Sequence, residues 1–193
     1  MNVKIAANII LSIVIAGMGF WLYKIIREPI VFEKEKKVRY EKTIQRLKDI
    51  RTAQIAYKDL KGRFAKNFDE LIFSLKNDSV PVVKAIGDVP DSLTEAQALA
   101  LGIIIRDTIY EPMLQRTFPQ GVELDSLPYI PFTNIRFTIN AGEIRRNNVM
   151  VPVFEVSAPD TIILRGLNEK FIDPKHELKV GSMTEPTYTG NWE

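Results

Sequence analysis

The sequence contains no cysteine and only one histidine among its 193 residues. Without cysteine, a disulfide scaffold, a thiolate metal site and a cysteine nucleophile are excluded. A single histidine leaves little material for zinc sites built on several imidazoles or for triads that depend on a histidine base. The charge excess is also small, because 26 Lys and Arg residues face 24 Asp and Glu residues and leave a net charge of +2. We therefore expect no nucleic-acid partner, since such proteins must neutralise many phosphates, and no enzyme.

The N-terminal segment holds the clearest physical signal, a run from Ile5 to Tyr23 that carries no charged residue. As a helix, about 19 residues span roughly 28 Å, close to the ~30 Å hydrocarbon thickness of a bilayer. Trp21 and Tyr23 end the run and Lys24 follows it, as is typical of a membrane–water interface. A cleaved signal peptide has a shorter apolar stretch with small residues at its cleavage site. We therefore expect residues 1–27 to form an uncleaved, single-span transmembrane anchor in contact with the lipid bilayer.

Residues 28–61 are expected to form a helical stalk that continues into a long amphipathic helix. Pro29 should break or kink the helix as it leaves the membrane. Beyond a charged stretch, apolar residues recur every three or four positions and form one stripe, made of Ile44, Leu47, Ile50, Ala53, Tyr57 and Leu60. The distal part of the stripe should pack on the domain. Its part nearer the membrane, Ile44, Leu47 and Ile50, should contact neighbouring subunits.

Residues 62–170 are expected to form an α+β globular domain of short helices and an antiparallel β-sheet, so the whole chain has an α+β fold class. Gly62 should end the long helix, and Asn67 with Glu70 three positions later predicts the start of a short helix. A loop and a further short helix should follow, over 80–90 and 92–102. Alternating apolar residues predict strands over 135–140 and 149–153, with a turn at 140–142. We expect another short strand over 161–164, and over 103–110 either a strand or a continuation of the preceding helix. The polar, turn-rich segment 171–193 should be an extended C-terminal tail.

No residue pattern predicts catalysis, a cofactor or a metal. The sequence has no glycine-rich phosphate loop, no Gly-x-Ser-x-Gly elbow and no His-Glu-x-x-His helix. His176 lies in a polar segment, as a surface histidine does. Oxygen ligands for Ca²⁺ could come from Asp88, Asp91 and Glu95, but the EF-hand spacing is absent, and acidic residues are favoured at helix starts in any case. Arg145 and Arg146 follow a predicted turn and could contact an acidic partner.

One stretch resembles a known family. The segment 53–64, Ala-Gln-Ile-Ala-Tyr-Lys-Asp-Leu-Lys-Gly-Arg-Phe, followed by Asp69-Glu70-Leu71, is similar to the helix end of type IV pilins and type II secretion pseudopilins. The whole chain also looks similar to small single-span envelope proteins of Gram-negative bacteria. The resemblance implies a subunit of envelope machinery whose globular part lies outside the cytoplasm. The excess of positive charge after the predicted span favours the cytoplasm by itself.

Two functions are therefore expected. The first is a membrane-anchored, non-catalytic envelope subunit of the bacterial inner membrane with a periplasmic domain. It would assemble with other membrane or envelope proteins, or with copies of itself, in a secretion or surface-structure machine. The second is an anchored periplasmic binding or accessory module that holds a peptide or an envelope protein against an exposed strand edge.

Overall fold

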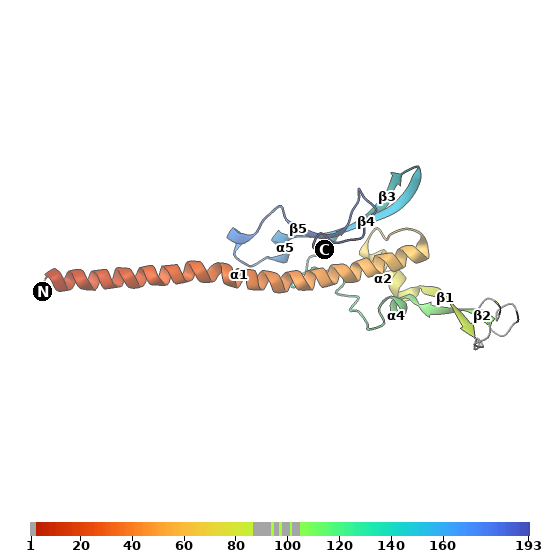
Figure 1. The fold of residues 1–193 in the computed structure, drawn as a ribbon, viewed down its shortest axis with the longest axis horizontal. Coiled ribbons are helices and arrows are strands. Elements are labelled where there is room, and N and C mark those ends of the chain that lie inside the picture. The colour runs from red at the N-terminus through yellow and green to blue at the C-terminus, as the bar shows by residue number, and fades with distance from the viewer. Residues whose placement is uncertain (1–2, 87–93, 95–96, 98–100, 102–104) are drawn as a thin grey trace.

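The structure is a computed structural model that describes residues 3–86, 94, 97, 101 and 105–193, with side chains of the first helix from Leu11 onward. It confirms the predicted α+β class, since a long helix is followed by short helices and two antiparallel sheets. The distal half of the long helix carries the rest of the fold, and its N-terminal end extends beyond every other element (Figure 1). Most of the helix predicted over 92–102 lies outside the described residues.

Helix α1 runs without interruption over Val3–Lys61, with Pro29 inside it. The predicted break at Pro29 is therefore wrong. A proline removes one backbone donor and crowds the preceding turn. Intact turns on both sides can hold such a helix together, so that it continues past the ring. The anchor segment and the amphipathic segment thus form one rod.

The end of α1 and the start of the next helix follow the sequence prediction. Gly62 adopts a left-handed conformation (φ 75°), and its N–H donates to the Lys58 carbonyl at 2.7 Å. Helix α2 (Phe68–Asn77) then begins at the cap Asn67, whose side-chain oxygen accepts from the Glu70 N–H at 2.8 Å. The Glu70 carboxylate in turn accepts from the Lys66 N–H at 3.0 Å. These bonds satisfy amide groups that a helix start otherwise leaves unpaired.

After α2 the chain forms a two-stranded ribbon, so the predicted loop is wrong over 80–86, and the rest of it, 87–90, lies outside the described residues. Strand β1 (Ser79–Ile86) pairs antiparallel with β2 (Ile105–Pro112), so that Val82 lies opposite Ile109. The predicted strand over 103–110 thus corresponds to β2. The valines of β1 favour an extended backbone, and the partner strand supplies its hydrogen bonds. Helix α4 (Met113–Thr117) then returns the chain to the domain.

The second sheet has the order β3–β4–β5, formed by Thr138–Arg146, Val149–Pro159 and Glu177–Gly181. The turn predicted at 140–142 is wrong, because these residues lie inside β3. The chain reverses instead at Asn147 and Asn148, whose φ values are 48° and 65°. Asparagine tolerates this left-handed conformation, which two-residue hairpin turns require at both central positions.

Two further segments differ from the sequence prediction. The predicted strand over 161–164 is the short helix α5 (Asp160–Ile163) with its cap. The segment 171–193, expected to be an extended tail, includes the end of the short 3-10 helix η1 (Glu169–Phe171) and the whole of β5. The last residues also pack on the sheet, where Gly190 bridges Val180. Polar composition concealed this strand, since only alternate residues of β5 face the core.

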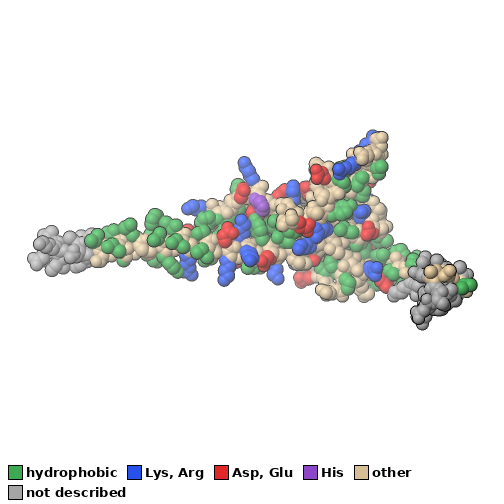
Figure 2. Space-filling model, viewed as in Figure 1, with side chains coloured by type: hydrophobic (Ala, Val, Ile, Leu, Met, Phe, Trp, Pro, Cys, Tyr) green, Lys and Arg blue, Asp and Glu red, His purple; other side chains and the backbone are tan. Residues whose placement is uncertain are grey.

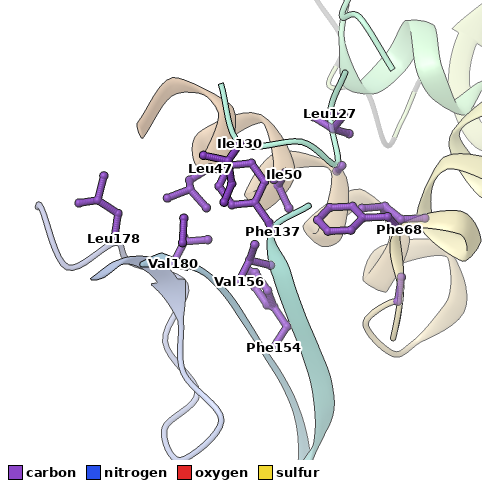
Figure 3. Packing of buried hydrophobic residues seen from close by; sticks show 14 of the residues in the cluster. Leu47, Ile50, Phe68, Leu127, Ile130, Phe137, Phe154, Val156, Leu178 and Val180 are labelled. Carbon is purple, nitrogen blue, oxygen red and sulfur yellow. The ribbon is translucent and has the colours of Figure 1, made fainter. Parts of the chain in front are cut away.

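The core lies between the distal half of α1 and the sheet. Leu47 and Ile50 of α1 have no exposed surface and meet Val156 and Val180 of the sheet (Figure 3). Phe137, which precedes β3, and Phe68 of α2 extend the same cluster. The amphipathic stripe of α1 therefore covers the apolar face of the sheet.

Within the part of the chain that the structure describes, no helix combines the length and the apolar character that crossing a membrane requires.

Candidate functional site

The surface that most needs an explanation is the N-terminal half of α1. We call residues 11–31 the apolar arm, because large apolar side chains are exposed along it (Figure 2). Their exposed fractions run from 46% at Ile25 to 71% at Phe20. Consecutive residues such as Ile13, Val14 and Ile15 are all exposed, and side chains 100° apart around the axis cover every side of a helix. Exposed apolar surface of this extent marks a contact with protein or membrane.

A groove lies at the base of the apolar arm, between α1 and the loop after α5. It has a volume of about 630 Å³, and the loop contributes Gly166, Leu167 and Asn168. The helix contributes apolar side chains and, between them, two basic and two acidic ones. Phe32, which also lines the groove, is 4% exposed and packs against the Phe171 ring at 5.3 Å between centroids. The domain therefore begins at Phe32, directly beside the groove.

The predicted interaction residues do not form one surface. Leu47 and Ile50 have no exposed surface and belong to the core, whereas Ile44 packs against the core and keeps part of its side chain exposed. The stripe is therefore buried over a longer stretch than expected, because the sheet reaches nearer the N-terminal end of α1. Arg145 and Arg146 lie at the end of β3, where the Arg145 guanidinium donates to the Asn148 side chain at 3.1 Å.

The structure brings together a polar cluster that sequence reasoning missed. Asp160, at the start of α5, is 2% exposed, and its Oδ2 atom accepts a short hydrogen bond from the Tyr40 hydroxyl of α1. His176 places Nδ1 3.0 Å from Asp160 Oδ1 and 3.2 Å from the Tyr40 oxygen. Burial, and then the hydrogen bond to Asp160, raise the pKa of Tyr40, so its hydroxyl remains a donor at neutral pH. Tyr40 lies 120 residues from Asp160 and 136 residues from His176 in the sequence, so no local pattern could predict these contacts.

This cluster has the acid–imidazole pair of a hydrolase but lacks a nucleophile. An aspartate beside a histidine ring can orient the imidazole as a general base. Among the described residues, however, the ring of His176 is hydrogen-bonded to Tyr40 and to no serine or threonine hydroxyl. The cluster instead joins α1, α5 and the approach to β5, because each of the three side chains comes from a different one of them. We interpret it as a fastening between the helix and the C-terminal half of the domain.

The described part of the chain contains no cluster of metal-ligating side chains. There, no group of three or more Asp, Glu or His side chains is arranged to hold a metal ion. Asp88, Asp91 and Glu95, considered above as oxygen ligands for Ca²⁺, lie outside the described residues.

The ribbon β1–β2 offers a second kind of surface. It extends past the distal end of α1 (Figure 1), and among the described residues its sheet contains two strands. Each strand of a two-stranded sheet has a partner on one side and presents backbone groups on the other. Val83 and Tyr110 on this ribbon are 61% and 71% exposed. Such an edge can pair with an added strand from another chain.

Searches against protein-family models, curated proteins and solved structures found no match for this chain.

Proposed function

We propose that the chain is a membrane-anchored, non-catalytic envelope subunit that resembles a pseudopilin. In this proposal the apolar arm and the residues before it hold the chain in the bacterial inner membrane, and the domain lies in the periplasm. The subunit assembles there with other membrane proteins, or with copies of itself, in a secretion or surface-structure machine. The exposure of the apolar arm is the observation that carries the proposal, because water is a poor environment for so much apolar surface.

The length of the uncharged run supports a span rather than a helix lying on a surface. The printed sequence has no charge from Ile5 to Tyr23, and this run begins before the first described side chain. A helix that lies in the membrane interface has one charged face and one apolar face. Over residues 11–23 of the apolar arm, by contrast, no exposed side chain is charged on any side of the helix, and Trp21 and Tyr23 end the run as interfacial aromatics do.

The resemblance to pseudopilins supports the periplasmic side and the assembly role. It rests on the helix end with Gly62 and Arg63 and on the turn into α2, and a long helix packed on an antiparallel sheet is the architecture that it implies. A non-catalytic role agrees with a polar cluster that has no nucleophile beside His176 in the described residues.

Fractionation and reporter fusions test the anchor and its sidedness. We expect the full chain to stay in the membrane fraction after carbonate extraction at high pH, which strips peripheral proteins. A reporter active only in the periplasm, fused after Glu193, should give signal, and a cytoplasmic reporter at the same site should not. Release by carbonate would refute the anchor, whereas the opposite reporter pattern would refute the periplasmic domain and the pseudopilin resemblance with it.

The ribbon β1–β2 favours a second candidate, an anchored binding or accessory module for a peptide or envelope protein. The ribbon has two strands among the described residues, and this arrangement, together with the exposed Tyr110, suits the addition of one strand. Crosslinking in membranes separates the two candidates, with a photo-reactive residue placed either at Ile13 on the apolar arm or at Val83 on the ribbon. Adducts of fixed stoichiometry from Ile13 support the subunit, and adducts from Val83 alone support the binding module.

A further inference from the structure

The helix wall of the groove at the base of the apolar arm carries an ordered set of side chains. They recur at spacings of three and four positions, with Arg27 and Glu28 adjacent, and so share one broad face of α1: Phe20, Lys24, Arg27, Glu28, Val31 and Glu35. Toward the domain, Phe20 is followed by the two basic residues and then by the two acidic ones, with Val31 between the glutamates. The Lys24 ammonium lies 4.0 Å from the Glu28 carboxylate, so the basic and acidic groups meet there. With a rise of 1.5 Å per residue, Phe20 and Arg27 are about 10 Å apart along the axis.

The opposite wall makes this face a site rather than an open helix surface. Leu167 and its two neighbours approach the helix from the loop after α5, and Phe32 closes the domain end. The volume of about 630 Å³ lies within the range of small-molecule sites. The Arg27 guanidinium also lies 5.7 Å from the centre of the Tyr23 ring, a contact that directs its charge toward the arm.

We propose that this groove binds one phospholipid whose headgroup is phosphoethanolamine. Its acyl chains lie along Phe20 and Tyr23, its phosphate sits between Lys24 and Arg27, and its ammonium group donates to Glu28 and Glu35. The inference rests on the membrane anchor proposed above, which puts Tyr23 at the headgroup level. The order of charges along the helix then matches the order of groups in the lipid: apolar chain, phosphate, ammonium.

Other occupants fit this order of charges less well. A lipid with only a phosphate charge brings no cation to Glu28 or Glu35, and its phosphate competes with Glu28 for Lys24, whose ammonium lies 4.0 Å from the Glu28 carboxylate. A choline headgroup carries the positive charge but has no N–H to donate, so it loses the charge-assisted hydrogen bonds to the carboxylates. A neighbouring apolar helix would bury four charged side chains, which is costly without partners.

Lipid retention by the full-length chain tests the proposal. The purified protein is incubated in mild detergent with equal amounts of phosphatidylethanolamine, phosphatidylcholine and phosphatidylglycerol, and retained lipid is measured by native mass spectrometry. We expect phosphatidylethanolamine to be retained about tenfold better than the other two, the effect of one charge-assisted hydrogen bond. Equal retention of the three lipids, or a preference for phosphatidylglycerol, would overturn the proposal.

Matched variants locate the binding to the groove. The double variant Glu28→Gln/Glu35→Gln should lose about ten times in retained phosphatidylethanolamine, with an unchanged circular dichroism spectrum because both side chains are exposed. The control is the double variant Glu33→Gln/Glu41→Gln, which also removes two negative charges from α1, at exposed residues that line a different part of the surface. Wild-type retention by the double variant would refute the assignment. Release of the chain by carbonate would instead refute the anchor itself, so the two failures are distinguishable.

Discussion

Gln54 is the buried polar residue whose replacement tests the architecture most sharply. It lies on the domain side of α1 with no exposed surface, and both ends of its amide bond the backbone of Ala65. Its Nε2 atom donates to the Ala65 carbonyl at 3.0 Å, and its Oε1 atom accepts from the Ala65 N–H at 2.9 Å. The Gln54 amide thus bonds both backbone groups of Ala65, as a neighbouring β-strand would, and holds the turn after Gly62 against the helix.

Replacing Gln54 with Met keeps a side chain of similar length and removes both hydrogen bonds. Ala65 has no exposed surface either, so water cannot replace the lost partners. A buried backbone N–H or C=O left unpaired costs about 1–3 kcal/mol, and burying the apolar Met side chain returns part of that loss. We expect Gln54→Met to lower the free energy of unfolding by about 2–4 kcal/mol, which lowers Tm by roughly 5–15 °C for a chain of this size.

The assay is urea unfolding of the full chain in mild detergent, followed by tryptophan fluorescence and circular dichroism. Gln45→Met is the matched control, because Gln45 is exposed on the same helix and its amide donates only to Asp49 at 3.0 Å. Surface changes of this kind usually stay within about 0.5 kcal/mol. A Gln54→Met variant as stable as Gln45→Met would refute the role assigned to the bonds with Ala65.

Three further changes test the core, a surface network and a backbone contact. Leu47→Asp should unfold the domain, since it buries an unpaired carboxylate where no surface is exposed; a cooperative thermal transition like that of the wild type would contradict the placement of Leu47 in the core. The hydrogen bond from Arg63 lowers the pKa of Glu70 from 4.5 to about 2. The ionised Glu70 carboxylate therefore stabilises the folded state by about 1–2 kcal/mol after solvent screening. This stabilisation is present above pH 4.5 and is lost as the pH falls toward 2. Acid titration of stability should therefore be flatter for Glu70→Gln, and identical curves would argue against the network. Gly181→Ala should cost more than about 2 kcal/mol in urea unfolding, because φ is +77° and a Cβ atom would lie 2.2 Å from the Phe154 carbonyl oxygen. Gly121→Ala, with φ +82° and open space, should cost less, and equal losses would refute the clash.

Local signals in the sequence predicted the parts of the fold that local physics decides. The left-handed Gly62 and the cap formed by Asn67 and Glu70 depend on residues within four positions of each other, and both agree with the structure. The turn of the β3–β4 hairpin was misplaced because two segments, 140–142 and 147–148, contain residues that suit a turn. Pairing of β3 with β4 decides between them, since Ala141 lies opposite Phe154 inside the sheet. A single strand read alone does not contain that information.

The candidate sites also differ in whether local sequence predicts them or long-range contacts create them. The part of the apolar arm before Lys24 is visible in the sequence as an uncharged run, and the structure adds that its large apolar side chains are exposed. The cluster of Tyr40, Asp160 and His176 depends on contacts across more than a hundred residues. Of its three residues, the sequence singled out His176 alone, as a surface histidine. The groove likewise needs the loop after α5, which no periodicity of α1 predicts.

The way in which α1 is fastened to the domain bears on how an assembly would orient the subunit. Three arginines of the helix donate to carbonyl groups from separate parts of the chain, namely Arg39 to Ile163 and Arg165, Arg46 to Ser126, and Arg51 to Tyr188. Arg51 also pairs with Glu193 at 2.8 Å. Hydrogen bonds from a charged donor are stronger than neutral ones, and these are spread over about 18 Å of helix. The domain therefore resists rotation about the helix axis, because any rotation breaks several of these bonds together. Since the apolar arm is the continuation of the same helix, a contact that fixes the azimuth of the arm among neighbouring helices also fixes which face of the domain points outward.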